Sequence, residues 1–109
     1  DGYDTLGYIH YVLHDYESAA EAFQSAIDKG ELSDRSDTLM FLSRAHLELR
    51  NFDAAADAAT DAADAGDERA SNSARDFIRA IEGRRTFYNT ISGRKEDAID
   101  FYQPYPPLQ

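Results

Sequence analysis

Two histidines on one predicted helix are the first candidates for metal chemistry. His10 and His14 are four residues apart, the spacing at which two imidazoles on one helix face can share a metal ion. His46 follows His10 by 36 residues within a repeated pattern, and no third ligand is evident in the sequence. A packing role for His10 is therefore the better interpretation.

A stripe of aspartates is the second candidate, in this case for calcium: Asp53, Asp57, Asp61 and Asp64. A rigid helix spreads such carboxylates apart, and no glycine-bent loop is present to bring their oxygens together around an ion. We interpret the stripe as a solvated helix face.

Signatures of catalysis are also missing from the sequence. The chain has no cysteine, which excludes cysteine nucleophiles and thiolate zinc sites. Its serines do not stand in a nucleophile elbow, a phosphate-binding loop or a Ser-x-x-Lys motif. We predict that the protein is not an enzyme and takes no cofactor and no metal.

Size and charge narrow the classes of partner. The chain has 109 residues, enough for one domain, and its 21 acidic against 11 basic residues give a net charge of −10. This charge opposes the capture of nucleic acid, and no run of about 20 apolar residues could span a membrane. The acidity is concentrated in residues 1–70, which hold 16 acidic and 5 basic groups (net −11), whereas residues 71–109 hold 5 and 6 (net +1). We also expect a sequence that opens at Asp1 without a leader to be part of a longer protein.

The elements that carry these residues repeat. Residues 3–26 align without gaps to residues 39–62, at a period of 36 positions. Each unit contains two runs with helical spacing, and Asp15 and Gly30 are good cap residues for the second run of the first unit. We predict helices at residues 2–14, 16–29, 37–49, 52–65 and 71–91 and a short one at 95–102.

The first unit resembles the tetratricopeptide repeat. It reads Tyr3-x2-Leu6-Gly7-x2-His10, followed by Ala19-x3-Phe23, with histidine where the family usually has tyrosine. The second unit keeps the leucine as Leu42 but has serine and alanine in place of the glycine and phenylalanine. The resemblance implies an all-α superhelix of stacked helix pairs, a solenoid that serves protein binding.

The resemblance also implies a division of the chain. It gives repeat 1 at residues 1–35, repeat 2 at 36–70, a degenerate third repeat or capping helix with a short appended helix at 71–102, and an extended proline-rich tail at 103–109. The run Asp28-Lys29-Gly30-Glu31-Leu32 and the helices after it are similar, more narrowly, to the C-terminal part of periplasmic repeat proteins associated with TonB energy transduction. That similarity implies a periplasmic location, with the cytoplasm as the alternative.

A binding groove is the predicted functional site. The first helix of each stacked pair lines the concave side, and large apolar and aromatic side chains there would bind a peptide or partner protein, with arginine as a polar anchor. The predicted groove residues are Asp4, Tyr8, Tyr11, Met40, Phe41, Arg44, Arg84 and Phe87.

Self-association is the alternative function. The chain would then be a structural segment of a longer solenoid that stacks on itself or on an upstream repeat. An N-terminal face bordered by Tyr3, Leu6 and Tyr16 could pair with a second copy to form a homodimer, or take the proline-rich tail of another chain.

Overall fold

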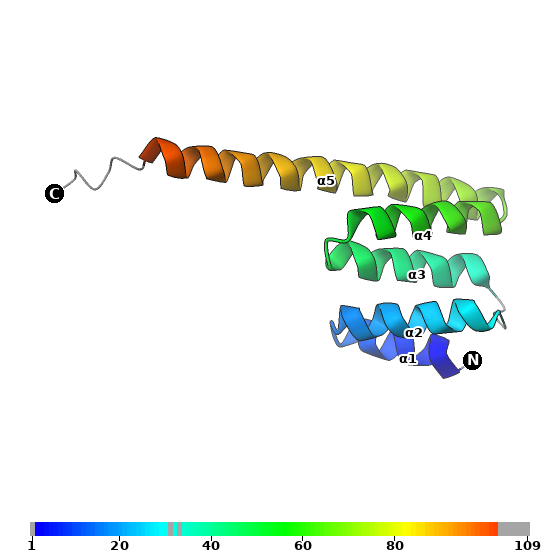
Figure 1. The fold of residues 1–109 in the computed structure, drawn as a ribbon. Helices are drawn as coiled ribbons and strands as arrows, with labels where there is room; N and C mark the ends of the chain where they lie inside the picture. Colours follow the sequence, from blue (N-terminus) through cyan, green and yellow to red (C-terminus); the bar gives the residue numbers. More distant parts are fainter. Residues whose placement is uncertain (1, 31, 33, 103–109) are drawn as a thin grey trace.

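Helices account for all the regular structure in the described residues of the computed structural model (Figure 1). They are α1 (Gly2–Val12), α2 (Tyr16–Lys29), α3 (Arg35–Glu48), α4 (Phe52–Ala65) and α5 (Glu68–Tyr102). The structure describes residues 2–30, 32 and 34–102, with the helical backbone alone for residues 93–102. Each helix packs mainly on its neighbours in the chain. The predicted all-α helical repeat is confirmed, while the predicted extended tail at 103–109 lies outside the described residues.

Two helices have the predicted bounds, and one of them, α2, is capped at both ends. The Asp15 side chain accepts a hydrogen bond from the backbone N–H of Ser18 at 3.4 Å at the start of α2. Gly30 ends α2 in the left-handed conformation, with φ at 76°. Helix α4 also runs over its predicted range, although Asn51 before it makes no side-chain cap hydrogen bond.

The other helix ends differ from the prediction for local reasons. Helix α1 ends at Val12 instead of residue 14, because the chain turns at His14, which has a φ of 63°. Helix α3 begins at Arg35 instead of residue 37, because the Asp34 carboxylate accepts a hydrogen bond from the backbone N–H of Asp37 at 2.9 Å.

Helix α5 corrects the prediction of two C-terminal helices. It begins at Glu68, because the Asp67 carboxylate accepts from the backbone N–H of Ala70 at 2.9 Å. It then continues through Gly93 to Tyr102 as one helix of 35 residues. A single glycine costs a helix only about 1 kcal/mol relative to alanine, which is too little to end it. Ser71, the first residue of the predicted helix at 71–91, is buried within α5 and donates its hydroxyl to the Ala63 carbonyl.

Small residues let the helices of each pair approach closely. Ala19 and Ala55 are fully buried. In the first pair, a Cβ built on Gly7 would lie 2.6 Å from the ring of Phe23, which is also fully buried. In the second pair the hydroxyl of Ser43 donates to the Ala55 carbonyl at 2.6 Å. None of the described helices is both long enough and apolar enough to cross a membrane.

Candidate protein-binding surface

An aromatic cluster joins α1 to α3. The ring centroids of Tyr8 and Phe41 lie 4.5 Å apart, and those of Tyr11 and Phe41 lie 5.7 Å apart. Beneath them the buried ring of Phe23 on α2 lies 5.8 Å from each of Tyr8 and Phe41. We call Tyr8, Tyr11 and Phe41 the aromatic cluster. The structure thus brings together three of the predicted groove residues from two helices.

Arg44 extends this cluster toward α5. Its guanidinium carbon lies 5.0 Å from the ring centroid of Phe41 and 5.9 Å from that of Phe77. The side chain is half-buried, and in the described part of the chain it forms no ion pair. Contact with aromatic faces holds a guanidinium in place through cation–π attraction, and this contact leaves the N–H donors of Arg44 unused.

Hydrogen bonds fix the rim of the cluster. The Tyr8 hydroxyl donates to the Asp37 carboxylate at 3.3 Å, and the Thr38 hydroxyl donates to the Asp4 carboxylate at 3.3 Å. Burial raises the pKa of the Tyr8 hydroxyl, and the charge of Asp37 raises it further. Burial also raises the pKa of Tyr11, although Arg44 opposes that shift. Both phenols therefore stay protonated near neutral pH, and the Tyr8 proton is used in the hydrogen bond to Asp37.

The remaining predicted groove residues lie elsewhere. Met40 is half-buried and packs against the core between the helices. Arg84 and Phe87 line a separate groove of about 390 Å³ beside the turn between α3 and α4, together with Tyr88 and Ile91. Phe77, which is not among the predicted groove residues, is the unexpected neighbour of Arg44. It stands 36 residues after Phe41, so the period itself could have identified it.

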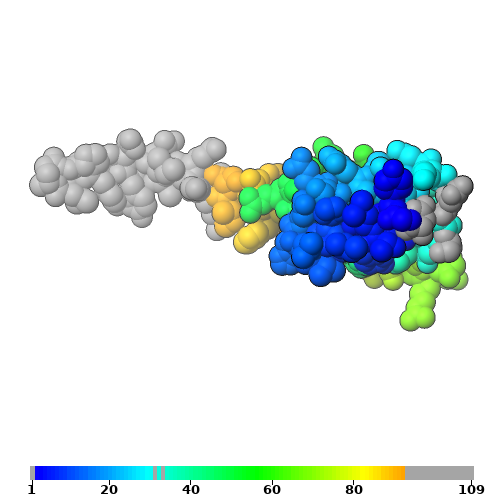
Figure 2. Space-filling view, turned by 90° about the horizontal axis from the view of Figure 1, so that it is seen from below, coloured from blue at the N-terminus to red at the C-terminus, as the bar shows by residue number. Residues whose placement is uncertain are grey.

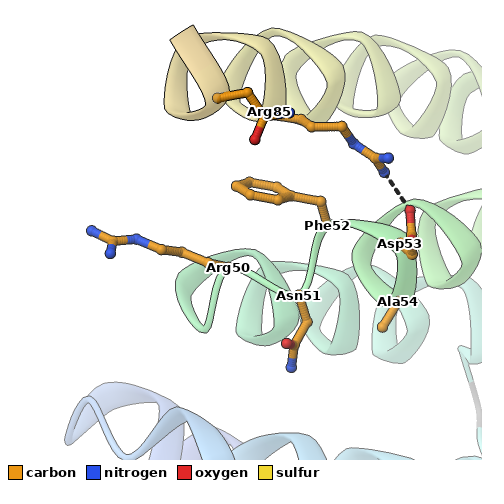
Figure 3. A pocket seen from close by; sticks show the side chains of 7 residues that line it. Arg50, Asn51, Phe52, Asp53, Ala54 and Arg85 are labelled. Atoms are coloured by element: carbon orange, nitrogen blue, oxygen red, sulfur yellow. Dashed lines mark ion pairs between the residues drawn. The ribbon is translucent and has the colours of Figure 1, made fainter. Parts of the chain in front are cut away.

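A hollow of about 530 Å³ lies beside the first turn of α4, and two of its lining residues form an ion pair that connects α5 to α4. In Figure 3, Arg85 reaches from α5 to Asp53 at the start of α4, with 2.7 Å between the guanidinium nitrogen and the carboxylate oxygen. The Arg85 guanidinium also lies 6.0 Å from the ring centroid of Phe52. These contacts fasten α5 to α4, whereas Arg50 points away from the pair (Figure 3).

His10 and His46 have different surroundings. His10 Nδ1 lies 3.4 Å from the Asp15 carboxylate, across the turn between α1 and α2. His46 is half-buried, and burial lowers its pKa. Among the residues that the structure describes, no three histidine, aspartate or glutamate side chains gather in a way that could hold a metal ion.

Comparison with known proteins identifies the repeat. A family model described as tetratricopeptide repeat matches residues 5–81, which is most of the chain. No curated protein and no solved structure matches the chain. The match includes the first half of α5 and does not support the narrower similarity to TonB-associated periplasmic proteins.

Proposed function

The chain belongs to the tetratricopeptide repeat family, and from this we propose that it is a protein-interaction module whose aromatic cluster and Arg44 bind a peptide or segment of a partner protein. Repeats of this family generally mediate protein–protein interactions and are typically not enzymes. We extend that role to this chain and to this particular surface.

The observation that carries the proposal is the arrangement of Tyr8, Phe41 and Arg44. Tyrosine and arginine are among the residue types that contribute most to binding energy at protein interfaces. Tyr8 keeps 36% of its surface exposed although it contacts two other rings. The cluster therefore offers a partner rigid apolar rings, while Arg44 offers planar donors for a carboxylate or carbonyl oxygen.

The proposal is tested by replacing the cluster and measuring the partner. A partner isolated with the wild-type protein is titrated against a Tyr8→Ala, Phe41→Ala variant, and we expect its affinity to fall at least tenfold. Val12→Ala is the matched control, because Val12 is an exposed apolar residue of the same helix α1. Unchanged affinity for the double variant, with its helical content retained by circular dichroism, would contradict the proposal.

Self-association is a second candidate, favoured by the outer side of α1. Leu6, Ile9 and Leu13 form a stripe at helical spacing and are 42%, 51% and 71% exposed. Figure 2 shows α1 in front on this face of the molecule. The net charge of −10 opposes pairing of two copies, but salt screens charges over about 10 Å at 0.1 M. A dimer through this face should therefore strengthen with salt, and sedimentation as a monomer at both low and high salt would exclude it.

A further inference from the structure

Among the residues that the structure describes, no other helix lies beside the second half of α5. Helix α5 has 35 residues, whereas α4, on which it packs, has 14. Phe52, the first residue of α4, has its ring centroid 5.8 Å from that of Tyr88. Cover by α4 therefore ends near Tyr88, and α5 projects beyond the other helices (Figure 1). At 1.5 Å per residue, residues 89–102 make about 20 Å of helix without a partner.

The projecting half of α5 begins with exposed apolar side chains. Phe87 is 67% exposed, Tyr88 41% and Ile91 46%. They line the groove of about 390 Å³ introduced above, which we call the α5 groove and whose main residues are Arg50, Phe52, Arg84, Phe87, Tyr88 and Ile91. Arg84, Phe87 and Ile91 follow one another at steps of three and four residues. They therefore share one face of the helix, as the anchors of a helix–helix contact do.

The charge of the α5 groove is opposite to that of the main body of the chain. Arg50 and Arg84 face a single acidic lining residue, Glu48, and neither arginine forms an ion pair in the described residues. The Arg50 guanidinium carbon lies 5.0 Å from the ring centroid of Tyr88, so one positive charge lies beside the apolar side chains of the groove. Residues 1–70, in contrast, carry a net charge of −11 from 16 acidic and 5 basic groups.

We propose that the α5 groove binds an acidic amphipathic helix of a partner protein. Apolar residues on one side of that helix would pack on Phe87, Tyr88 and Ile91, and carboxylates beside them would bind Arg50 and Arg84. Because the main body is acidic, most of the molecule repels such a partner, whereas Arg50 and Arg84 attract it. This surface is separate from the aromatic cluster and does not depend on it.

The first test compares three synthetic helices. The probe is a fluorescein-labelled peptide of about four helical turns, with leucine along one stripe and glutamate on the other faces. Two control peptides carry lysine in place of glutamate or alanine in place of leucine. By fluorescence anisotropy, the acidic leucine peptide should bind at least tenfold more tightly than either control. Equal binding of the lysine peptide, or no binding of the acidic one, would overturn the proposal.

Variants of the protein locate the binding. Arg84→Glu should weaken the acidic peptide at least tenfold and shift the preference to the lysine peptide, and Phe87→Ser should weaken both. Arg75→Glu is the matched control, because it makes the same charge change at an exposed site of α5 outside the groove. Arg84 and Phe87 are exposed, so we expect both variants to keep the helical content of the wild type.

Three further results would contradict the assignment. If Arg75→Glu weakens binding as much as Arg84→Glu does, the attraction is general and not a property of the groove. If Tyr8→Ala with Phe41→Ala abolishes peptide binding, the peptide lies on the aromatic cluster. If the free protein sediments as a dimer that Phe87→Ser dissociates, a second copy of the chain occupies the groove.

Discussion

Gly7 and Phe23 should depend on each other for the stability of the first helix pair. A Cβ on Gly7 would lie 2.6 Å from Cε1 and 2.7 Å from Cδ1 of Phe23, closer than carbon atoms can approach. The ring cannot move aside, because it is fully buried and lies 5.8 Å from the Phe41 ring. The second pair has the reverse combination, with Ser43 and Ala59 at the positions 36 residues later. A double-mutant cycle that exchanges one combination for the other tests this packing.

The expected magnitudes follow from the two opposite changes in volume. Gly7→Ser overpacks the site by about 1–3 kcal/mol, and the better helix propensity of serine returns only about 0.5 kcal/mol. Phe23→Ala leaves a cavity and should cost about 3–5 kcal/mol. In the double variant the serine has room, so the clash disappears. The double variant should then be more stable than the sum of the single effects predicts, by about 1–2 kcal/mol.

Urea unfolding of the four proteins, followed by circular dichroism, measures the coupling. Phe23→Leu replaces Phe23→Ala in the cycle if the alanine variant does not fold, since it removes part of the ring with a smaller loss. Single effects that add within about 0.5 kcal/mol would show that the two sites are independent. That result would refute the claim that Phe23 requires glycine at position 7, and so would a Gly7→Ser variant as stable as the wild type.

Three other changes have defined outcomes. Ala19→Leu or Ala55→Leu should each lower the free energy of unfolding by about 1–3 kcal/mol in urea titrations, because both alanines are fully buried; two wild-type stabilities would contradict the close helix approach. Gly30→Ala should cost about 1–2 kcal/mol through its φ of 76°, and an unchanged melting temperature would count against that strain. Burial lowers the pKa of His46, so the unfolded chain binds the extra proton and stability should fall as pH drops below about 6.5. His46→Asn should flatten that pH dependence in thermal unfolding, and an unaltered slope for this variant would refute the assignment.

Local signals explain how much of the fold was predictable. Asp15 and Gly30 are strong cap residues, and the helix between them has the predicted bounds. Toward the C-terminus, Gly93 lies in the gap between the predicted helices at 71–91 and 95–102, but it does not end the helix. One glycine without a nearby proline or capping side chain does not outweigh the hydrogen bonds on either side of it, and α5 continues. The sequence shows which residues favour a helix end. It shows less reliably whether such a residue is enough to end the helix.

The candidate site was predictable as far as the repeat was visible. The 36-residue period and the expectation that first helices line the concave side indicated Tyr8, Phe41 and Arg44 together, and in the structure Phe41 contacts both of the others. Phe77 was missed because the repeat in α5 keeps few of the family's typical residues. The exposure of Phe87 depends on how far α5 extends past the end of α4. That distance cannot be predicted from the residue pattern of either helix alone.

The order in which the helices pack has a kinetic consequence. From α1 to α5, each helix makes most of its contacts with the helix next to it in the chain. Proteins dominated by contacts between nearby residues search little conformational space and fold in microseconds to milliseconds. In a linear array folding also begins in one unit and spreads to the next, because each unit is stabilised by its contact with its neighbour. A substitution that destabilises one pair, such as Gly7→Ser, should therefore change the unfolding rate of the N-terminal half. Hydrogen exchange in the contact between α4 and α5 should stay close to that of the wild type.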